Sequence, residues 1–348
     1  MRAARHRFRA VSQWVLLKDC VGQEPLVNVR CSCLCLALLA FLPAPLLAWG
    51  PIGHMAVAYI AYQNLSPETR IRVRDLLKLN PDYANWEKQI PSGTSADDHD
   101  RMIFMIASTW ADDIKTEAQY SDDGIDGGNT PGGASSSRNI GYSDLLRHRY
   151  WHFVNTAFSP DQTPLPELPT PNAQTQILAF RAVLASSQPD ELKSYDLVWL
   201  VHLVGDVHQP LHAVTRVTKF HLTGDAGGNV VKLFGDADPT LHSYWDDLPG
   251  SDCKFCNDKI PCVNRAIVLG NAYQSISSKS HSLDPAAWIR ESFDEARTKV
   301  YRDPIGTEDQ PYTIVPGSPY ETQAQKLAIK RVALAGVRLA QVLNSELK

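Results

Sequence analysis

Hydrophobic positions downstream of residue 48 recur mostly with the period of an α-helix. Between residues 55 and 65 apolar side chains repeat at intervals of three and four, and a second helix is predicted to start with Ser66 as its cap and Pro67 at its first position. The same periodicity continues in the segments NAQTQILAFRAVLASS, DELKSYDLVWLVHLVGDVH, NRAIVLGNAYQSIS, DPAAWIRESFDEARTKVY and YETQAQKLAIKRVALAGVRLAQVLN. The pattern therefore predicts an all-α, that is a mainly α-helical, protein.

Strand-like runs are short and few, and NVVKLF, at 229–234, is the best of them. Two segments interrupt the helical pattern. Residues 121–143 are rich in Gly and Ser and are expected to form a flexible loop, whereas 159–172 read as a stiff proline-rich connector. Neither segment separates regions that look independently complete, so we expect a single domain over residues 49–348.

The first 48 residues have the composition of a secretory leader. The uncharged run CSCLCLALLAFLPAPLLA, at 31–48, follows a basic segment and ends in alanine, which predicts cleavage after Ala48. An uncleaved membrane anchor is the alternative, but Pro43 and Pro45 interrupt a run already shorter than the roughly 20 residues of a membrane span. We therefore expect a secreted or periplasmic protein, without stable membrane association once the leader is removed.

Charge and cysteine content narrow the classes of partner. Removing 1–48 takes away six Lys/Arg and two Asp/Glu, so the formal net charge moves from −4 to near −8. Such an acidic protein is a poor binder of duplex nucleic acid unless bound cations change the charge locally. Cys253, Cys256 and Cys262 remain, and this odd number suggests one disulfide of unassigned pairing plus a free or intermolecular thiol.

The segment HLVGDVHQPLH contains the most informative polar residues. His202 and Asp206 are four residues apart on a predicted helix, so both side chains project from one face. Pro210 should end or bend that helix and let His212 turn back toward the same region. A hydrogen-bonded His–Asp pair in a core is the simpler interpretation, because buried polar groups need partners.

A second pair at the same spacing favours metal binding instead. LHSYWDD places His242 four residues before Asp246. Three more candidates lie in apolar or aromatic contexts, namely Asp112 in STWADDIK, His152 in RYWHFVN and His54 in WGPIGH. Imidazoles and carboxylates without cysteine suit zinc in an exported hydrolase, and their number exceeds the roughly four ligands of one zinc ion. Clustered divalent ions favour phosphoryl transfer, so phosphate ester cleavage is the leading chemistry.

Six motifs together carry a resemblance to a known family. They are, in order, WGPIGH, WADDIK, WHFVN, HLVGDVHQPLH, GDAGGN and LHSYWDD. From Trp49 to about Asn344 the chain resembles the secreted, zinc-dependent, single-strand-specific nucleases of the S1/P1 type, which are related to zinc-dependent phospholipase C. The resemblance implies a helical fold with three zinc ions at the bottom of a cleft.

The resemblance also implies which residues bind each zinc ion. The first zinc of a close pair would be held by Asp112, His152, His202 and Asp206. The second would be held by His54, by Asp206 as a bridge, and by the amino nitrogen and carbonyl oxygen of Trp49. The third would be held by His212, His242 and Asp246. Cleavage after Ala48 would then be a chemical requirement, because only a free amino group at Trp49 binds zinc well.

For the reaction, the resemblance implies an endonuclease that hydrolyses single-stranded DNA and RNA to 5′-phosphate products, with 3′-nucleotidase activity. Lys115, three residues after Asp112, would stabilise charge on the transition state; a solvated surface lysine is the alternative interpretation. Asn229 would contact the scissile phosphate or a bound water. Phe153 would stack on a nucleobase, and a place in the core is the equal alternative. Asn155 stands where many family members have an aspartate that holds the base edge, so the base preference is open.

Two other functions stay open. A zinc-dependent phospholipase C would share the helical architecture and the N-terminal tryptophan ligand but would cleave lipid headgroup esters; Lys115 and Phe153 fit a nuclease better. A secreted binding or structural protein could keep zinc for stability alone, although structural zinc sites are usually closed and cysteine-rich. We expect a monomer. His208 is expected to lie behind the metal ligands or at the helix end, and His148 to be solvent-facing or locally hydrogen-bonded.

Overall fold

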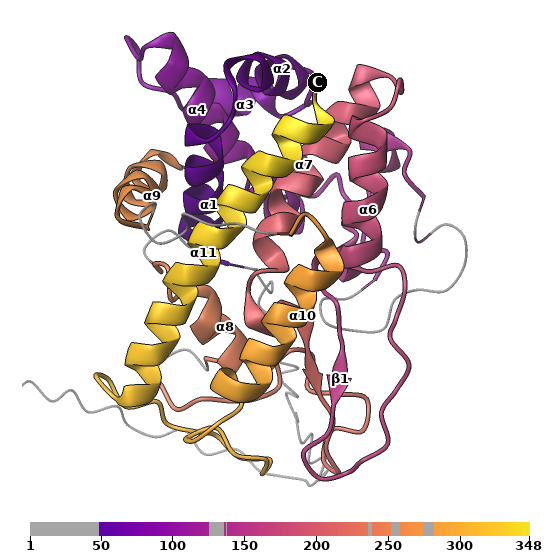
Figure 1. Cartoon of the computed structure of the whole chain (residues 1–348), viewed down its shortest axis with the longest axis vertical. Helices are drawn as coiled ribbons and strands as arrows, with labels where there is room; N and C mark the ends of the chain where they lie inside the picture. The colour runs from indigo at the N-terminus through magenta and orange to yellow at the C-terminus, as the bar shows by residue number, and fades with distance from the viewer. Residues whose placement is uncertain (1–48, 125–135, 137, 236–238, 252–257, 274–281) are drawn as a thin grey trace, which may run out of the picture. The chain divides into compact units, whose positions relative to one another are not determined.

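The computed structural model describes residues 49–124, 136, 138–235, 239–251, 258–273 and 282–348 (Figure 1). All of them belong to one compact unit, Pro43–Lys348. The predicted leader, most of the predicted glycine-rich loop, Cys253 and Cys256 lie outside the described residues. Within the described ranges, no helix combines the length and the apolar character needed to cross a membrane.

Helices dominate the described chain, so the predicted mainly α-helical fold is confirmed. The longer ones are α1 (Pro51–Gln63), α2 (Pro67–Leu77), α4 (Ala96–Ala107), α6 (Ala173–Leu184), α7 (Asp190–Asp206), α9 (Ile260–Tyr273), α10 (Pro285–Glu295) and α11 (Pro319–Glu346). The short ones are α3 (Tyr83–Glu87), α5 (Trp110–Asp113), α8 (Leu241–Asp246), the 3₁₀ turns η2 (Gly141–Asp144), η3 (Arg149–His152) and η4 (Pro210–Ala213), and the π-helical η6 (Ala296–Val300). Ser66 caps α2 as predicted, because its side chain accepts a hydrogen bond from Thr69 N.

Helices α1 and α7 form the centre of the fold. Every residue of α1 from Ile52 to Tyr62 is buried, and so is every residue of α7 from Lys193 to Asp206. A helix that is buried all round belongs inside the core, and α7 contacts α1, α2, α5, α6 and α11. Polar residues on these two helices are therefore carried into the interior, which is where the candidate site forms.

Helix α11 crosses α1 at close range (Figure 1). At Gly336 of α11, a Cβ atom would lie 2.6 Å from Ile60 Cβ and 2.9 Å from Val57 O. Only glycine permits this approach. The contact fixes the axis of α1, whose N-terminal turns carry His54.

Two apolar clusters support the elements of the site. The larger cluster contains most of α1 and α7 together with Trp110 and Trp151, which flank the site residues of α5 and η3. The smaller cluster contains Leu211 of η4 and Leu241 and Trp245 of α8, packed with residues of η6 and α11. The candidate site residues are thus supported partly by each cluster.

Strands are marginal in the described residues. β1 (Ala157–Phe158) pairs in parallel with β2 (Thr215–Arg216), and both are too short to show any sequence periodicity. NVVKLF, the best of the strand-like runs, does not form a strand. Lys232 and Leu233 make only isolated bridges, to Thr240 and Tyr312, because the chain segments beside them are loops that each offer one pairing position.

Candidate metal centre

The eight predicted side-chain ligands come from six elements that converge in the interior. They lie on α1 (His54), α5 (Asp112), η3 (His152), α7 (His202, Asp206), η4 (His212) and α8 (His242, Asp246). Every one of these residues is at most 6 % exposed. Helix α7 ends at Asp206 and Pro210 opens η4, so the chain turns back as predicted and brings His212 beside His152.

Five of the residues form one continuous group around Asp206. Its Oδ2 lies 2.9 Å from His152 Nδ1 and 3.4 Å from His202 Nε2, and its Oδ1 lies 3.3 Å from His54 Nε2. Asp112 Oδ1 is 3.6 Å from His202 Nε2. These residues form two sets of possible metal ligands: His54, His202 and Asp206, and Asp112, His152 and His202. In each set the ligand atoms lie within 4.8 Å of one another, and the two sets share His202. We call these five residues the Asp206 group.

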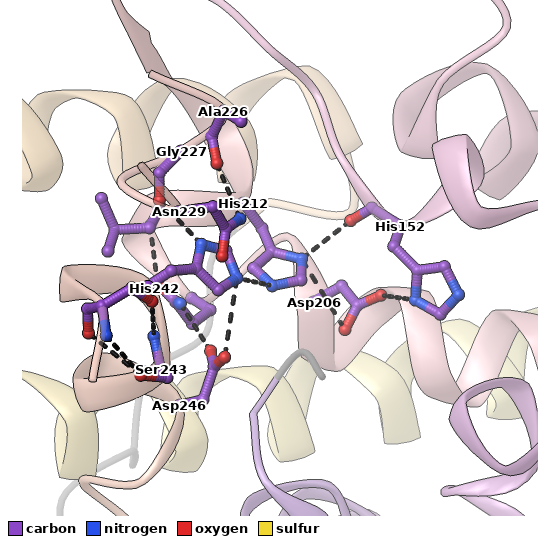
Figure 2. A network of polar contacts seen from close by, with 12 residues as sticks. His152, Asp206, His212, Ala226, Gly227, Asn229, His242, Ser243 and Asp246 are labelled. Carbon is purple, nitrogen blue, oxygen red and sulfur yellow. Dashed lines mark hydrogen bonds and ion pairs between the residues drawn. The ribbon is translucent and has the colours of Figure 1, made fainter. Parts of the chain in front are cut away.

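The other three residues form a second set, which we call the His212 group (Figure 2). His212 Nε2 and His242 Nε2 are 3.1 Å apart, and Asp246 Oδ2 is 3.6 Å from His242 Nε2. His212 Nδ1 lies 4.0 Å from Asp206 Oδ1, so the two groups adjoin. The structure therefore brings all eight predicted side chains together, in the two neighbourhoods that the motifs implied.

Backbone carbonyls fix the protonation of three histidine rings. Nδ1–H of His202 donates to Ser108 O at 2.8 Å, that of His212 to His152 O at 2.9 Å, and that of His242 to Gly227 O at 2.7 Å. A carbonyl can only accept, so Nδ1 carries the proton and Nε2 of each neutral ring carries a lone pair. All three rings thus present Nε2 to the site.

The fit to a metal is decided by the pair of Nε2 atoms in the His212 group. Two lone pairs that face each other at 3.1 Å cannot form a hydrogen bond and call for a cation between them. Two nitrogens bound to one tetrahedral zinc at about 2.0–2.1 Å lie about 3.3 Å apart. The donor set, histidines and aspartates without cysteine, also suits zinc.

Burial keeps the imidazoles neutral, which is the form that binds metal. Burial lowers the pKa of His54 and of His242 to about 4, and it also lowers the pKa values of His152, His202 and His212. For Asp112, burial would raise the pKa, but the charge and hydrogen bond of Lys115 act against burial, and the pKa is lowered. The site therefore offers neutral nitrogens beside at least one ionised carboxylate.

Lys115 is part of the same buried neighbourhood. Its Nζ lies 2.9 Å from Asp112 Oδ1, and the side chain is fully buried. A lysine held inside a protein by a site carboxylate differs from a solvated surface lysine, which was the alternative interpretation of this residue. The ammonium group thus lies directly beside a predicted ligand of the Asp206 group.

The GDAGGN loop supports the His212 group through its backbone. Gly227, with φ +61°, provides the carbonyl that accepts from His242, and a Cβ atom there would lie 2.4 Å from Leu211 O. Asn229 Nδ2 donates to Ala226 O on the same loop (Figure 2). Its Oδ1 is buried and has no hydrogen-bond partner within the described part of the chain.

The predicted base-binding residues lie beside the ligands. Phe153 stacks on His212, with ring centroids 4.4 Å apart, and is only 2 % exposed, so a base could stack on it only after neighbouring groups shift. Asn155 is partly exposed, two residues further along. Trp49 is fully buried, and the next residue, Gly50, donates its N–H to Asp246 O at 2.9 Å. Their contacts with substrate or metal stay predictions.

The model of the S1/P1 Nuclease family matches residues 49–348. The chain belongs to this family. Curated relatives include Endonuclease 3 and Endonuclease 5 of Arabidopsis thaliana, each 26 % identical to this S1/P1 nuclease over 86 % of its length and over 88 % and 90 % of their own. Nuclease S1 of Aspergillus oryzae (strain ATCC 42149 / RIB 40) is 25 % identical over 64 % of the chain and 59 % of its own length. The protein is accordingly a nuclease, a phosphodiesterase among the hydrolases.

Two residues of this S1/P1 nuclease are buried and hydrogen-bonded in ways that the sequence did not indicate. His148 is fully buried rather than solvent-facing, and its ring nitrogens bond Asp123 and Asp144, so only the locally bonded alternative holds. Gln209 is fully buried beside Asp246 and was not singled out. The sequence signal for Gln209 was its place between the candidate ligands Asp206 and His212 in DVHQPLH.

His208 lies just beyond the end of α7, one of the two places expected for it. Its Nδ1–H donates to Val204 O at 2.7 Å, and its Nε2 accepts from Arg338 at 3.0 Å. Cys262, at the start of α9, is disulfide-bonded, whereas the other two cysteines of its motif lie among the residues left undescribed.

Proposed function

We propose that the protein is a secreted, zinc-dependent endonuclease that hydrolyses single-stranded DNA and RNA to 5′-phosphate products, with 3′-nucleotidase activity. Three zinc ions would be bound, two by the Asp206 group with Trp49 and one by the His212 group. The observation that carries this proposal is the pair of unprotonated Nε2 atoms of His212 and His242, 3.1 Å apart beside a second, adjoining set of buried ligands.

Zinc held at these groups would supply a Lewis acid that activates water for attack on phosphorus and stabilises the leaving oxygen. The chain's own contribution is to place the ligands before substrate arrives. Ser108 O and Gly227 O orient the imidazoles of His202 and His242, so little reorganisation is needed on binding. Asp206, in contact with three imidazoles, is suited to bridge the close pair.

Lys115 and Asn229 would act on the phosphate. Lys115 Nζ, held at Asp112, can donate to a phosphate oxygen on which negative charge increases in the transition state. Asn229, on the loop that orients His242, would contact the phosphate or its water through its side-chain amide. Phe153 and Asn155 would bind the adjacent nucleoside by stacking and by hydrogen bonds to the base edge.

An acidic chain can bind nucleic acid in this way because the charge is local. Three zinc ions would add up to six positive charges at the place where phosphate must lie. Single strands are favoured because an unpaired base can leave its neighbours and reach a side chain, whereas a base in a duplex must first be unstacked. Affinity should then depend more on zinc than on surface lysines.

The decisive experiment measures acid-soluble nucleotide release from denatured and from duplex DNA, with the same protein after chelation and after addition of zinc. We expect preference for denatured DNA, loss on chelation and recovery with zinc. Phosphocholine release from lecithin without nucleotide release would instead assign a phospholipase C. Undiminished nuclease activity after verified removal of metal would refute the proposal.

Secretion and the N-terminal ligand are tested on the secreted protein itself. N-terminal sequencing should begin at Trp49, and metal analysis of the same sample should give three zinc ions per chain. A form that retains Ala48 would have an amide at Trp49, so it should lose the zinc held there and by His54, together with much of the activity. A fully active uncleaved form would contradict this part of the proposal.

A further inference from the structure

Gln209 occupies the turn that joins the two ligand groups. It lies between α7, which ends at Asp206, and η4, which carries His212, and it is fully buried. Its backbone N–H donates to Asp206 O at 2.9 Å, and its carbonyl accepts from His212 N at 3.0 Å. The main chain of Gln209 therefore connects a ligand of one group to a ligand of the other.

The side chain of Gln209 reaches a third ligand. Nε2 donates to Asp246 Oδ1 at 2.8 Å, and Oε1 accepts from Leu211 N at 2.6 Å. The second bond fixes the amide, because Leu211 N–H can only donate and must face the oxygen. The first bond therefore always presents N–H to Oδ1 of Asp246.

The two oxygens of Asp246 consequently face different groups. Oδ1 receives the amide of Gln209, whereas Oδ2 lies 3.6 Å from His242 Nε2, on the side of the ligand atoms. Figure 2 shows the carboxylate of Asp246 directed at the ring of His242. A carboxylate with one oxygen held by a hydrogen bond is oriented to bind a metal through the other.

The turn around Gln209 is itself anchored. Arg331 of α11, which is 2 % exposed, donates Nε–H to His208 O at 3.0 Å, and Ser292 of α10 donates to Val207 O at 2.6 Å. Helices outside the site thus hold the backbone from which the amide of Gln209 projects. A fixed amide can impose an orientation on Asp246 rather than follow it.

We propose that Gln209 is the positioning residue of the His212 group: its amide turns Asp246 so that Oδ2 is the oxygen offered to the metal. This inference rests on the proposed binding of zinc by His212, His242 and Asp246. It adds that zinc affinity of this group depends on the side chain of Gln209, which touches neither metal nor substrate in this arrangement.

The test uses Gln209→Glu in the full chain. A glutamate keeps an acceptor for Leu211 N but presents an oxygen, not N–H, to Asp246 Oδ1. Zinc affinities are measured by competition with a chelator, and His242→Ala identifies the zinc that belongs to this group. We expect that zinc to bind about 10–100-fold more weakly in Gln209→Glu, the usual effect of losing such a supporting bond, with the other zinc ions unaffected.

A matched control separates positioning from the cost of a buried carboxylate. Gln176 of α6 is also buried, and its Oε1 accepts from Thr175 Oγ1, so Gln176→Glu keeps that bond as Gln209→Glu keeps its own. The control should bind all zinc ions as the unmodified protein does. Gln209→Met, which lacks both polar atoms, provides a second variant should the glutamate prevent folding.

Melting of the metal-free variants distinguishes positioning from a structural effect. If Gln209 acts by positioning, Gln209→Glu and Gln176→Glu should have similar midpoints of thermal unfolding in the presence of chelator. Excess zinc should restore the activity of Gln209→Glu. Equal weakening of every zinc ion, or unchanged affinity of the His212 group in Gln209→Glu and Gln209→Met, would overturn the inference. If His242→Ala and the unmodified protein bind the same number of zinc ions, the His212 group binds no zinc, and the proposed function is refuted instead.

Discussion

His202 and His242 each donate Nδ1–H to a backbone carbonyl, but the two carbonyls belong to different kinds of structure. Ser108 O lies at the end of α4, beside the larger apolar cluster. Gly227 O lies in a loop with φ +61°. The Asp206 group is thus positioned mainly by buried helices, and the His212 group mainly by a loop, two short helical turns and Gln209. Different substitutions should therefore weaken zinc binding by the two groups.

The largest effect is expected from Asp206→Asn. Asp206 contacts three imidazoles, and the amide keeps its shape while it removes the negative charge and places N–H groups against nitrogens that should carry lone pairs. Losing a group that only supports a ligand costs about 10–100-fold in metal affinity or activity, so this loss should exceed a hundredfold. Zinc content and release of nucleotides from denatured DNA measure it.

A control for Asp206→Asn lies on the same helix. Burial raises the pKa of Asp196 to about 8, outweighing the bond from Asn139, so this aspartate is largely neutral at pH 7. Asp196→Asn then exchanges one buried neutral group for another of the same shape, and zinc content and activity should hardly change. Equal losses in the two variants would mean that the helix, not the site, had been damaged.

Gly227→Ala should selectively damage the His212 group. The added Cβ would lie 2.4 Å from Leu211 O, a backbone atom that cannot swing away, and φ +61° is unfavourable for alanine. The loop must move, and the carbonyl that orients His242 moves with it. We expect one zinc ion to be lost, with activity falling about a hundredfold, as a 1 Å misplacement can cause. Retention of all zinc ions would contradict the loop's positioning role.

Gly205→Ala is the corresponding change in the Asp206 group, and its effect should be smaller. The Cβ would lie 2.8 Å from His54 Nδ1, a side-chain atom that can yield by a slight rotation. Alanine also favours the helix over glycine by about 1 kcal/mol, which offsets part of the crowding. Activity should fall about tenfold while the midpoint of thermal unfolding changes little. A loss as large as that of Gly227→Ala would remove the contrast between the two groups.

The same contrast explains what could be predicted from the sequence. Most of the longer helices, the cap at Ser66 and the convergence of His202, Asp206 and His212 follow from local rules: helical period, capping and the break at Pro210. His242 and Asp246 followed from repeated spacing. These rules operate over a few residues. They predicted α7, which carries His202 and Asp206, but not the short α8, which carries His242 and Asp246.

What could not be predicted depends on contacts distant in sequence. The strand-like run NVVKLF lacked a partner segment of any length, which no property of the run itself reveals. Gln209 became important only because α8 places Asp246 opposite it, 37 residues later. For His148 the local bond to Asp144 was among the expected alternatives, whereas its bond to Asp123 depends on the fold bringing that distant residue to it.

The smallest effect on activity concerns His148, which lies outside both groups. Its Nδ1 is 2.7 Å from Asp123 Oδ2 and its Nε2 is 3.0 Å from Asp144 Oδ2. The hydroxyl of Tyr150 also donates to Asp123, and that of Tyr195 donates to Asp144. Burial would lower the pKa of His148, but the bonds and charges of the two aspartates outweigh burial and raise it.

A raised pKa in the folded state means that protonated His148 stabilises the fold below the unfolded value of about 6.5, and that this stabilisation is lost as the pH rises through the folded value. His148→Gln should therefore lower the free energy of unfolding by about 1–3 kcal/mol near pH 6 and by less near pH 9. Urea unfolding in chelator measures this without contributions from zinc, with His99→Gln on α4 as a control for loss of a more exposed imidazole. A difference that grows with pH would mean that the neutral ring, not the imidazolium, joins Asp123 to Asp144.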